Sequence, residues 1–153
     1  MTLDIVDGLV QEDSLRISWK KGHESQFYWQ ADVPADFSQM EQDGGALVME
    51  FMINKYPKGS VTQRMDCGWP CRGEIDVTEF YKSIPLRQRS KVGISLSCFK
   101  KMGVDMEKIT SPLVLVSKDE FEITFSDVRV IANASEDNTI QLCDSEVATL
   151  LQD

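Results

Sequence analysis

Short segments in which apolar and polar residues alternate are the feature that most constrains how this chain folds. Apolar residues occupy every second position of Ser14–Lys20, and the pattern returns in Gln26–Ala31 and Val92–Cys98. Neighbouring side chains of a β-strand point to opposite faces, so a period of two predicts strands with one buried face. The segment Ala46–Ile53, which is apolar except for Glu50, is the strongest strand prediction.

Turn-forming residues separate these segments. Asn54–Gly59 predicts a turn that joins Ala46–Ile53 to Ser60–Asp66 as a hairpin, and the polar stretch between Ala31 and Gly45 predicts a long loop. The remaining predictions are strands at Leu113–Val116, Phe121–Phe125 and Val128–Ile131, and helical turns at Val77–Lys82 and Met106–Ile109. Many short strands with few helical turns predict an all-β fold, a single β-sandwich of the jelly-roll kind over residues 1–143, followed by a tail at 144–153.

Charge excludes two classes of partner. The 153 residues carry a formal net charge of -9, whereas nucleic acids and anionic membrane surfaces attract clustered Lys and Arg. No apolar stretch approaches the length that spans a bilayer, and the first ten residues lack the pattern of a signal peptide. We therefore expect a neutral ligand, no nucleic-acid or membrane partner, and any export signal elsewhere.

Four cysteines invite three interpretations. The even count favours two disulfides, for which we pair Cys67 with Cys71 and Cys98 with Cys143. A zinc site is disfavoured because the second pair is widely spaced and the single histidine, His23, is remote. Buried free thiols remain an open alternative. His23 follows Gly22 in a polar turn, which favours a solvated side chain over a catalytic base.

Aromatic residues in loops are the best candidates for binding a sugar, because a flat aromatic ring complements the apolar face of a pyranose. Trp69 lies in a loop bounded by Gly and Pro, and Tyr56 lies at the tip of the expected hairpin. On the polar face of that hairpin, Glu50, Gln63 and Arg64 are candidate hydrogen-bonding partners. Trp19 and Trp29 fall on apolar strand faces and are expected in the core.

An acidic triplet offers a catalytic alternative. Glu74, Asp76 and Glu79 resemble the Glu-x-Asp-x-x-Glu signature of family 16 β-glucanases, in which the resemblance would make Glu74 the nucleophile, Asp76 its assistant and Glu79 the acid/base. The competing interpretation is a loop that enters a short helix capped by Asp76 or Thr78. We favour the second, because the residues after Glu79 do not continue the family's pattern.

Calcium is a further alternative. Carboxylates spread along the chain could supply oxygen ligands, although their spacing fits no fixed loop motif. The candidates are Asp32, Asp36, Asp43 and Asp127.

Several segments, among them Met65–Thr78 and Leu96–Phe99, occur in the same order as, and resemble, those of the C-terminal galactose-binding-like domain of bacterial family 3 exo-β-glucanases of the ExoP type. The central one is similar to that family's Cys-Gly-x-x-Cys-x-Gly-x-Val-Asp-Val-Thr stretch. The resemblance runs from about Gln11 to Cys143. It rests on Gln11–Asp13, Ile17–Trp19, Met65–Thr78, Leu96–Phe99, Gly103–Met106, Ser111–Leu113 and Phe125–Arg129.

The resemblance implies a galactose-binding-like sandwich that is an accessory module and not itself an enzyme. In the family, the catalytic residues lie on other domains. It implies β-glucan or a related oligosaccharide and the parent's catalytic domains as partners, no cofactor, and a periplasmic or secreted location. Two alternatives stay open: a small β-glucanase that uses Glu74, and a purely structural domain without a ligand.

Overall fold

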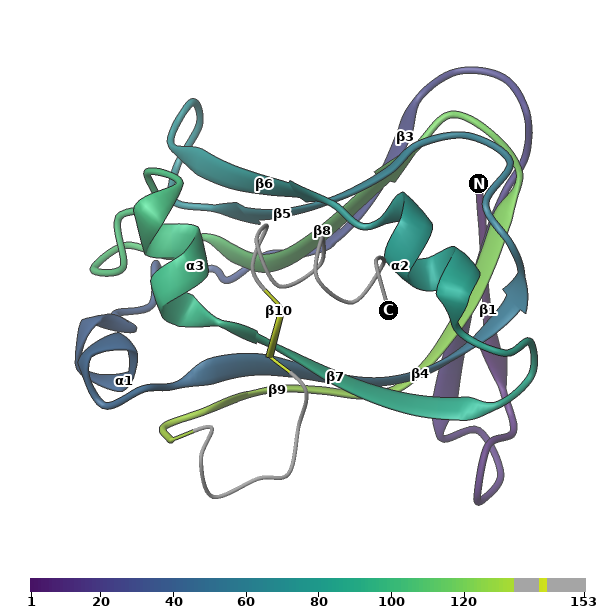
Figure 1. Ribbon diagram of the computed structural model, residues 1–153, viewed down its shortest axis with the longest axis horizontal. Helices are drawn as coiled ribbons and strands as arrows, with labels where there is room; N and C mark the ends of the chain where they lie inside the picture. The colour runs from purple at the N-terminus through teal and green to yellow at the C-terminus, as the bar shows by residue number, and fades with distance from the viewer. Residues whose placement is uncertain (134–140, 143–153) are drawn as a thin grey trace.

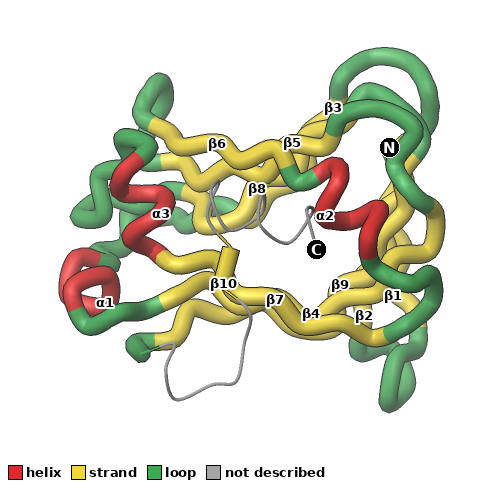
Figure 2. Tube along the Cα trace, viewed as in Figure 1, coloured by secondary structure: helices red, strands yellow, loops and turns green. Residues whose placement is uncertain are grey.

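The computed structural model describes residues 1–133 and the backbone of residues 141–142. Two β-sheets pack face to face, as the alternating pattern predicts, and short helices fill the ends between them (Figures 1 and 2). The strands are β1 Thr2–Val6, β2 Ser14–Trp19, β3 Ser25–Trp29, β4 Ala46–Lys55, β5 Val61–Asp66, β6 Arg72–Asp76, β7 Arg89–Ser95, β8 Ser111–Ser117, β9 Phe121–Ile131 and β10 Gln141–Leu142. The helices are α1 Ser38–Gln42, α2 Thr78–Ser83 and α3 Leu96–Lys101.

The larger sheet has six strands in the order β1-β2-β9-β4-β7-β10, and the smaller sheet has four in the order β3-β8-β5-β6. All described pairs are antiparallel except β10 with β7. This arrangement confirms the predicted all-β, galactose-binding-like sandwich.

Aromatic side chains fill the space between the sheets. Tyr81 of α2 lies 5.5 Å from Phe51 and 5.6 Å from Phe121 between ring centroids, and Phe121 stacks on Trp19 at 5.4 Å. Trp19 is 3% exposed, so its predicted place in the core is confirmed. Trp29 is 38% exposed and its predicted burial is wrong, because β3 is an edge strand that ends at this residue.

The predicted hairpin of Ala46–Ile53 and Ser60–Asp66 is wrong, because the two strands lie in different sheets. β4 is apolar on both faces and already pairs with β7 on one edge and β9 on the other. The chain after β4 therefore crosses to the smaller sheet. There the inward side chain of Gln63 meets β4 across the core, with its Nε2 donating to Met49 Sδ at 3.4 Å.

Other differences from the prediction have local causes. The strand expected at Val92–Cys98 ends at Ser95, whose hydroxyl accepts a hydrogen bond from Ser97 N and begins α3. Residues Met106–Ile109 form a turn and a bridge to Ala35 instead of a helix. The strands expected at Phe121–Phe125 and Val128–Ile131 are one strand with a bulge.

The long loop expected before Gly45 contains α1, and β1 was not predicted.

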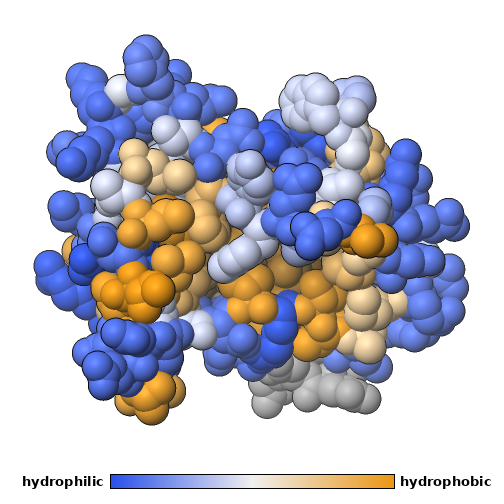
Figure 3. Space-filling view, turned by 180° about the vertical axis from the view of Figure 1, so that it is seen from behind, coloured by the Kyte–Doolittle hydropathy of each residue, from blue (hydrophilic) through white to orange (hydrophobic). Residues whose placement is uncertain are grey.

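Exposed apolar side chains are common in the first third of the chain, and the view from behind shows extensive hydrophobic surface in orange (Figure 3). They include Leu3, Ile5, Leu9, Val10 and Val33. No helix in the part of the chain that the structure describes is both long and apolar enough to cross a membrane.

Candidate functional site

A short loop between β5 and β6 presents a tryptophan at the surface. The disulfide between Cys67 and Cys71 closes this loop, with the two Cα atoms 5.0 Å apart, as predicted. Cys67 N donates to Cys71 O at 2.9 Å and Cys71 N donates to Gly68 O at 2.8 Å. Gly68 has a φ of 86° and its N–H donates to Thr110 Oγ1 at 3.1 Å, so the loop is tied to the segment before β8.

The structure describes only one of the two cysteines of the second predicted disulfide. Cys98 is disulfide-bonded, whereas its predicted partner Cys143 lies outside the described residues. The alternative of buried free thiols is wrong for Cys67, Cys71 and Cys98.

Trp69 itself is 71% exposed, which leaves most of its ring in contact with solvent. The Arg72 Cζ lies 4.4 Å from the centroid of the indole and the Arg64 Cζ lies 5.6 Å from it. An arginine over an aromatic face is attracted by the ring's quadrupole. The loop therefore holds an exposed, flat apolar surface that is bordered by two cations.

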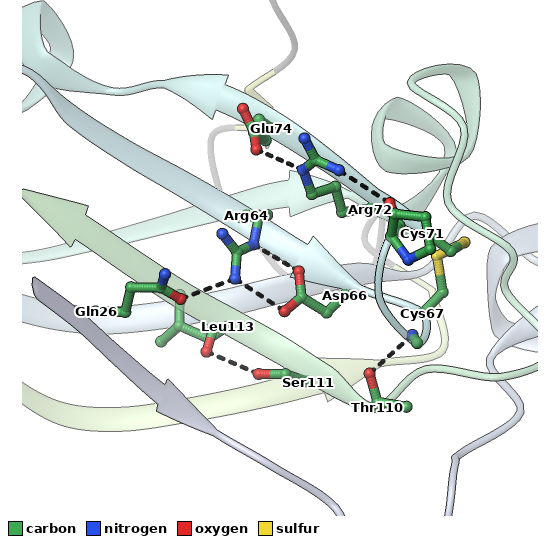
Figure 4. A network of polar contacts seen from close by, with 12 residues as sticks. Gln26, Arg64, Asp66, Cys67, Cys71, Arg72, Glu74, Thr110, Ser111 and Leu113 are labelled. Carbon is green, nitrogen blue, oxygen red and sulfur yellow. Dashed lines mark hydrogen bonds and ion pairs between the residues drawn. A yellow bond between two sulfur atoms is a disulfide. The ribbon is translucent and has the colours of Figure 1, made fainter. Parts of the chain in front are cut away.

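Four charged side chains alternate in sign on the outer face of β5 and β6 (Figure 4). Arg64 pairs with Asp66 through Nε at 2.6 Å and Nη2 at 3.0 Å, and Arg72 Nε pairs with Glu74 Oε1 at 2.9 Å. The strand register sets Arg64 opposite Glu74 and Asp66 opposite Arg72. These two cations and two carboxylates cancel one another, and Asp76 adds a further carboxylate on the same face at the far end of β6.

A hollow of about 290 Å³ lies beside the indole, and we call it the Trp69 hollow. Its second aromatic is Tyr28 of β3, which is 52% exposed. Arg64 Nη2 also donates to Gln26 Oε1 at 2.9 Å, so a bonded polar network crosses the sheet from β3 to β5 (Figure 4). The hollow is lined by Gln26, Tyr28, Gln30, Arg64, Asp66, Gly68, Trp69, Thr110 and Ser111.

The structure separates the five residues predicted to bind a ligand. Trp69 and Arg64 lie together in the Trp69 hollow. Tyr56 is at the opposite end of β5, 38% exposed, and its hydroxyl donates to Ile84 O at 2.7 Å. Gln63 is fully buried, because it is an inward residue of β5. Glu50 lies in the other sheet, where it pairs with Arg129 at 3.4 Å.

The other seven residues of the hollow were missed, among them Gln26, Tyr28 and Asp66. The alternation of β3 does place Gln26 and Tyr28 on its polar face. They lie near Trp69, however, only because the strand order is β3-β8-β5, which local sequence does not reveal.

The acidic triplet has separate local partners. Glu74 pairs with Arg72, and Glu79 pairs with Lys82 of the same helix at 3.4 Å. Asp76 Oδ1 accepts a hydrogen bond from Thr78 N at 2.9 Å at the start of α2. The N-cap of α2 is Val77, and the helix has no side-chain cap hydrogen bond, so the predicted capping by Asp76 or Thr78 is wrong. The Thr78 Oγ1 instead accepts a hydrogen bond from Val61 N at 2.8 Å.

The expected calcium ligands do not gather. Within residues 1–133 and 141–142, no group of three or more His, Cys, Asp or Glu side chains is placed to hold a metal ion. Asp36 accepts from Ser38, Asp43 accepts from Gln39, and Asp127 pairs with Arg129. Asp32 is likewise outside any such group.

A second tryptophan lines a larger depression of about 580 Å³, which we call the Trp29 groove. Trp29 is held by edge contacts with Phe27 at 4.8 Å and Phe125 at 6.1 Å between centroids. The groove lies where β1, β2 and β9 of one sheet face β3 and β8 of the other. It is lined by Ile5, Glu12, Asp13, Ser14, Leu15, Trp29, Pro112, Phe125, Ser126, Asp127 and Val128.

Comparison with known proteins gives one family. A model described as galactose-binding domain-like matches residues 1–130. No curated protein sequence matches the chain.

Solved structures share the fold. The extra C-terminal domain (X) of the exo-1,3/1,4-β-glucanase ExoP from a Pseudoalteromonas species is 17% identical, with a TM-score of 0.72 over 92% of this chain and 74% of that one. The whole enzyme is 20% identical, with a TM-score of 0.75, and this chain spans 17% of it.

A family 30 carbohydrate-binding module of the cellulosomal cellulase Cel9D-Cel44B of Clostridium thermocellum is 19% identical, with a TM-score of 0.65 over 90% of this chain and 84% of the module. The extra C-terminal domain and the family 30 module are accessory domains of glycosidases and not catalytic domains.

Proposed function

We propose that this chain, which belongs to the galactose-binding domain-like family, binds β-glucan as the non-catalytic accessory domain of a family 3 glycoside hydrolase. The observation that carries the proposal is the exposed indole of Trp69 beside a hollow lined by fixed hydrogen-bonding groups. Membership of the galactose-binding domain-like family and the ExoP-type resemblance support a family 3 glycoside hydrolase as the parent enzyme.

The chemistry of the Trp69 hollow suits a sugar. A pyranose ring has an apolar C–H face that packs on an indole, and hydroxyl groups at its edge that need donors and acceptors. Arg64 and Asp66 hold each other in a bidentate pair, so their remaining N–H groups and lone pairs are already oriented. Tyr28 supplies a second exposed ring.

Charge supports a neutral polysaccharide. The four charged residues beside Trp69 cancel, and the whole chain carries a net charge of -9. An anionic polysaccharide would meet no net attraction at the hollow and repulsion from the rest of the surface. A β-1,3/1,4-glucan, on which the ExoP enzyme of the comparison acts, is neutral and fits this requirement.

The Trp29 groove favours a second role, packing against the catalytic domains of the parent enzyme. Large exposed apolar patches on soluble domains mark interaction sites, contacts with other protein domains among them. Ile5 and Trp29 expose 71% and 38% of their surface at this groove. The two roles are compatible because the two depressions share no lining residue. The disulfide at Cys67 supports a periplasmic or secreted location, where such bonds persist.

Affinity electrophoresis tests the proposal directly. The 153-residue chain is run in native gels that contain laminarin, lichenan or no polysaccharide, and reducing-sugar release is measured on the same substrates. Retardation without released sugar is expected. Released sugar would overturn the non-catalytic assignment in favour of Glu74 chemistry, and the absence of both effects would leave a purely structural domain as the better account.

A further inference from the structure

Arg72 makes a close contact with Trp69. It is the first residue of β6, directly after the disulfide-closed loop, and its Cζ lies 4.4 Å from the indole centroid. At that distance the planar guanidinium covers a face of the ring. Arg64 is farther away, at 5.6 Å.

Two further bonds fix the guanidinium in this position. Its Nε donates to Glu74 Oε1 at 2.9 Å, which anchors it to the strand, and its Nη1 donates to Pro70 O at 3.0 Å, which anchors it to the loop itself (Figure 4). An arginine bound at two separate nitrogens loses little further freedom when it stacks on a ring.

Arg72 also lies apart from the side where a ligand would enter. Trp69, Gly68 and Arg64 line the Trp69 hollow, whereas Arg72 does not. The indole therefore contacts Arg72 and borders the hollow, whereas Arg72 itself lies outside the hollow's lining.

We propose that Arg72 is a positioning residue: its guanidinium covers one face of the Trp69 indole and holds the ring in place, so that the opposite face is presented to a sugar. The proposal rests on the proposed function for its ligand. A side chain that is already ordered loses less entropy on binding, and one immobilised side chain corresponds to about a fivefold gain in affinity. Arg64 differs, because it lines the hollow and would contact the sugar itself.

Motion of the indole tests the positioning without any ligand. The ¹⁵N relaxation of the Trp69 Nε1–H group is measured in the wild-type chain and in Arg72→Gln, Arg72→Lys and the matched surface control Arg16→Gln. The order parameter of this N–H group should fall in Arg72→Gln, fall less in Arg72→Lys, and stay unchanged in the control. The buried Trp19 indole reports in each sample that the core is intact.

Affinity for laminarihexaose, measured by titration calorimetry, tests the consequence. Arg72→Gln should weaken binding about fivefold. In a Trp69→Ala background, the same change should leave the residual affinity unaltered, because Arg72 acts only through the indole. A further loss in that background would show direct contact with the sugar and overturn the positioning role.

The failures of the two proposals are distinguishable. An unchanged indole order in Arg72→Gln would overturn the positioning role whether or not a sugar binds. A looser indole in a chain whose wild type binds neither laminarihexaose nor cellohexaose would support the positioning of Trp69 and overturn the proposed sugar site.

Discussion

The two exposed tryptophans of this sandwich lie in surroundings of opposite character. Trp69 stands on a loop beside a hollow of about 290 Å³ that is lined by amide, guanidinium, carboxylate and hydroxyl groups. Trp29 is wedged between Phe27 and Phe125 in a groove of about 580 Å³ with an apolar floor. The smaller depression has the chemistry of a sugar site, and the larger has the chemistry of a contact with protein.

The difference teaches that size alone does not identify a ligand site. The carboxylate of Asp13 lines the Trp29 groove but is already used, since it accepts the backbone N–H groups of Leu9 and Val10 and the Ser14 hydroxyl. A sugar in that groove would find few oriented partners for its hydroxyl groups.

The ion pair of the Trp69 hollow should matter most for stability. Arg64 is 8% exposed, so Arg64→Gln leaves the carboxylate of Asp66 without its partner in a half-buried place. We expect a loss of about 3 kcal/mol in the free energy of unfolding, measured in urea at pH 7. At the groove, Arg129→Gln breaks the partly exposed pairs with Asp127 and Glu50 and should lower the free energy of unfolding by about 0.5 kcal/mol. Equal losses would contradict the distinction.

The two tryptophans should differ in their effect on binding. Trp69→Ala removes the stacking surface and is expected to weaken binding of laminarihexaose about 100-fold, or about 2.8 kcal/mol. Trp29→Ala should leave this affinity within about twofold, because its groove takes no part. Titration calorimetry measures both, and the reverse ranking would assign the sugar to the Trp29 groove.

The disulfide should support both the Trp69 loop and the stability of the fold. Replacing Cys67 and Cys71 together by Ser opens a very short loop, for which the chain-entropy estimate gives a loss of about 2 kcal/mol in unfolding free energy. Affinity for laminarihexaose should fall with it. Unaltered affinity would show that the backbone bonds from Cys67 N to Cys71 O and from Gly68 N to Thr110 suffice to hold Trp69.

The smallest effect concerns acid stability at the groove. The backbone N–H of Val10, followed by the Ser14 hydroxyl, lowers the pKa of Asp13 below its ordinary 3.8. A carboxylate with a lowered pKa stabilises the fold above that ordinary value and loses its contribution as pH falls through the folded pKa. The melting temperature of Asp13→Asn should therefore be slightly below wild type at pH 6, and the difference should shrink as the pH falls below 3.8 and disappear once it has passed the folded pKa. A difference that grows with acid would contradict this assignment.

Sequence alone predicts the local parts of this molecule well. Strands at Ser14–Trp19 and Ser25–Trp29 follow from alternation, and the Cys67–Cys71 spacing identifies the loop that holds Trp69. A period of two is a property of neighbouring residues, so it survives whatever the strand pairs with.

What sequence could not reveal depends on pairing between distant strands. Local sequence places Gln63 and Glu50 on one polar surface because β4 and β5 follow each other in the chain, yet they occupy different sheets. The residues around Trp69, in contrast, come from β3 and from the segment before β8, which supply Tyr28 and Thr110. Strand order is set by the whole core and not by any one segment.

The chain has three tryptophans, and their indole N–H signals can show directly whether a sugar binds beside Trp69 or beside Trp29. In a ¹H–¹⁵N titration with laminarihexaose, the account predicts that the Trp69 signal shifts and saturates while those of Trp29 and the buried Trp19 stay in place. A saturating shift of Trp29 with an unmoved Trp69 would contradict it.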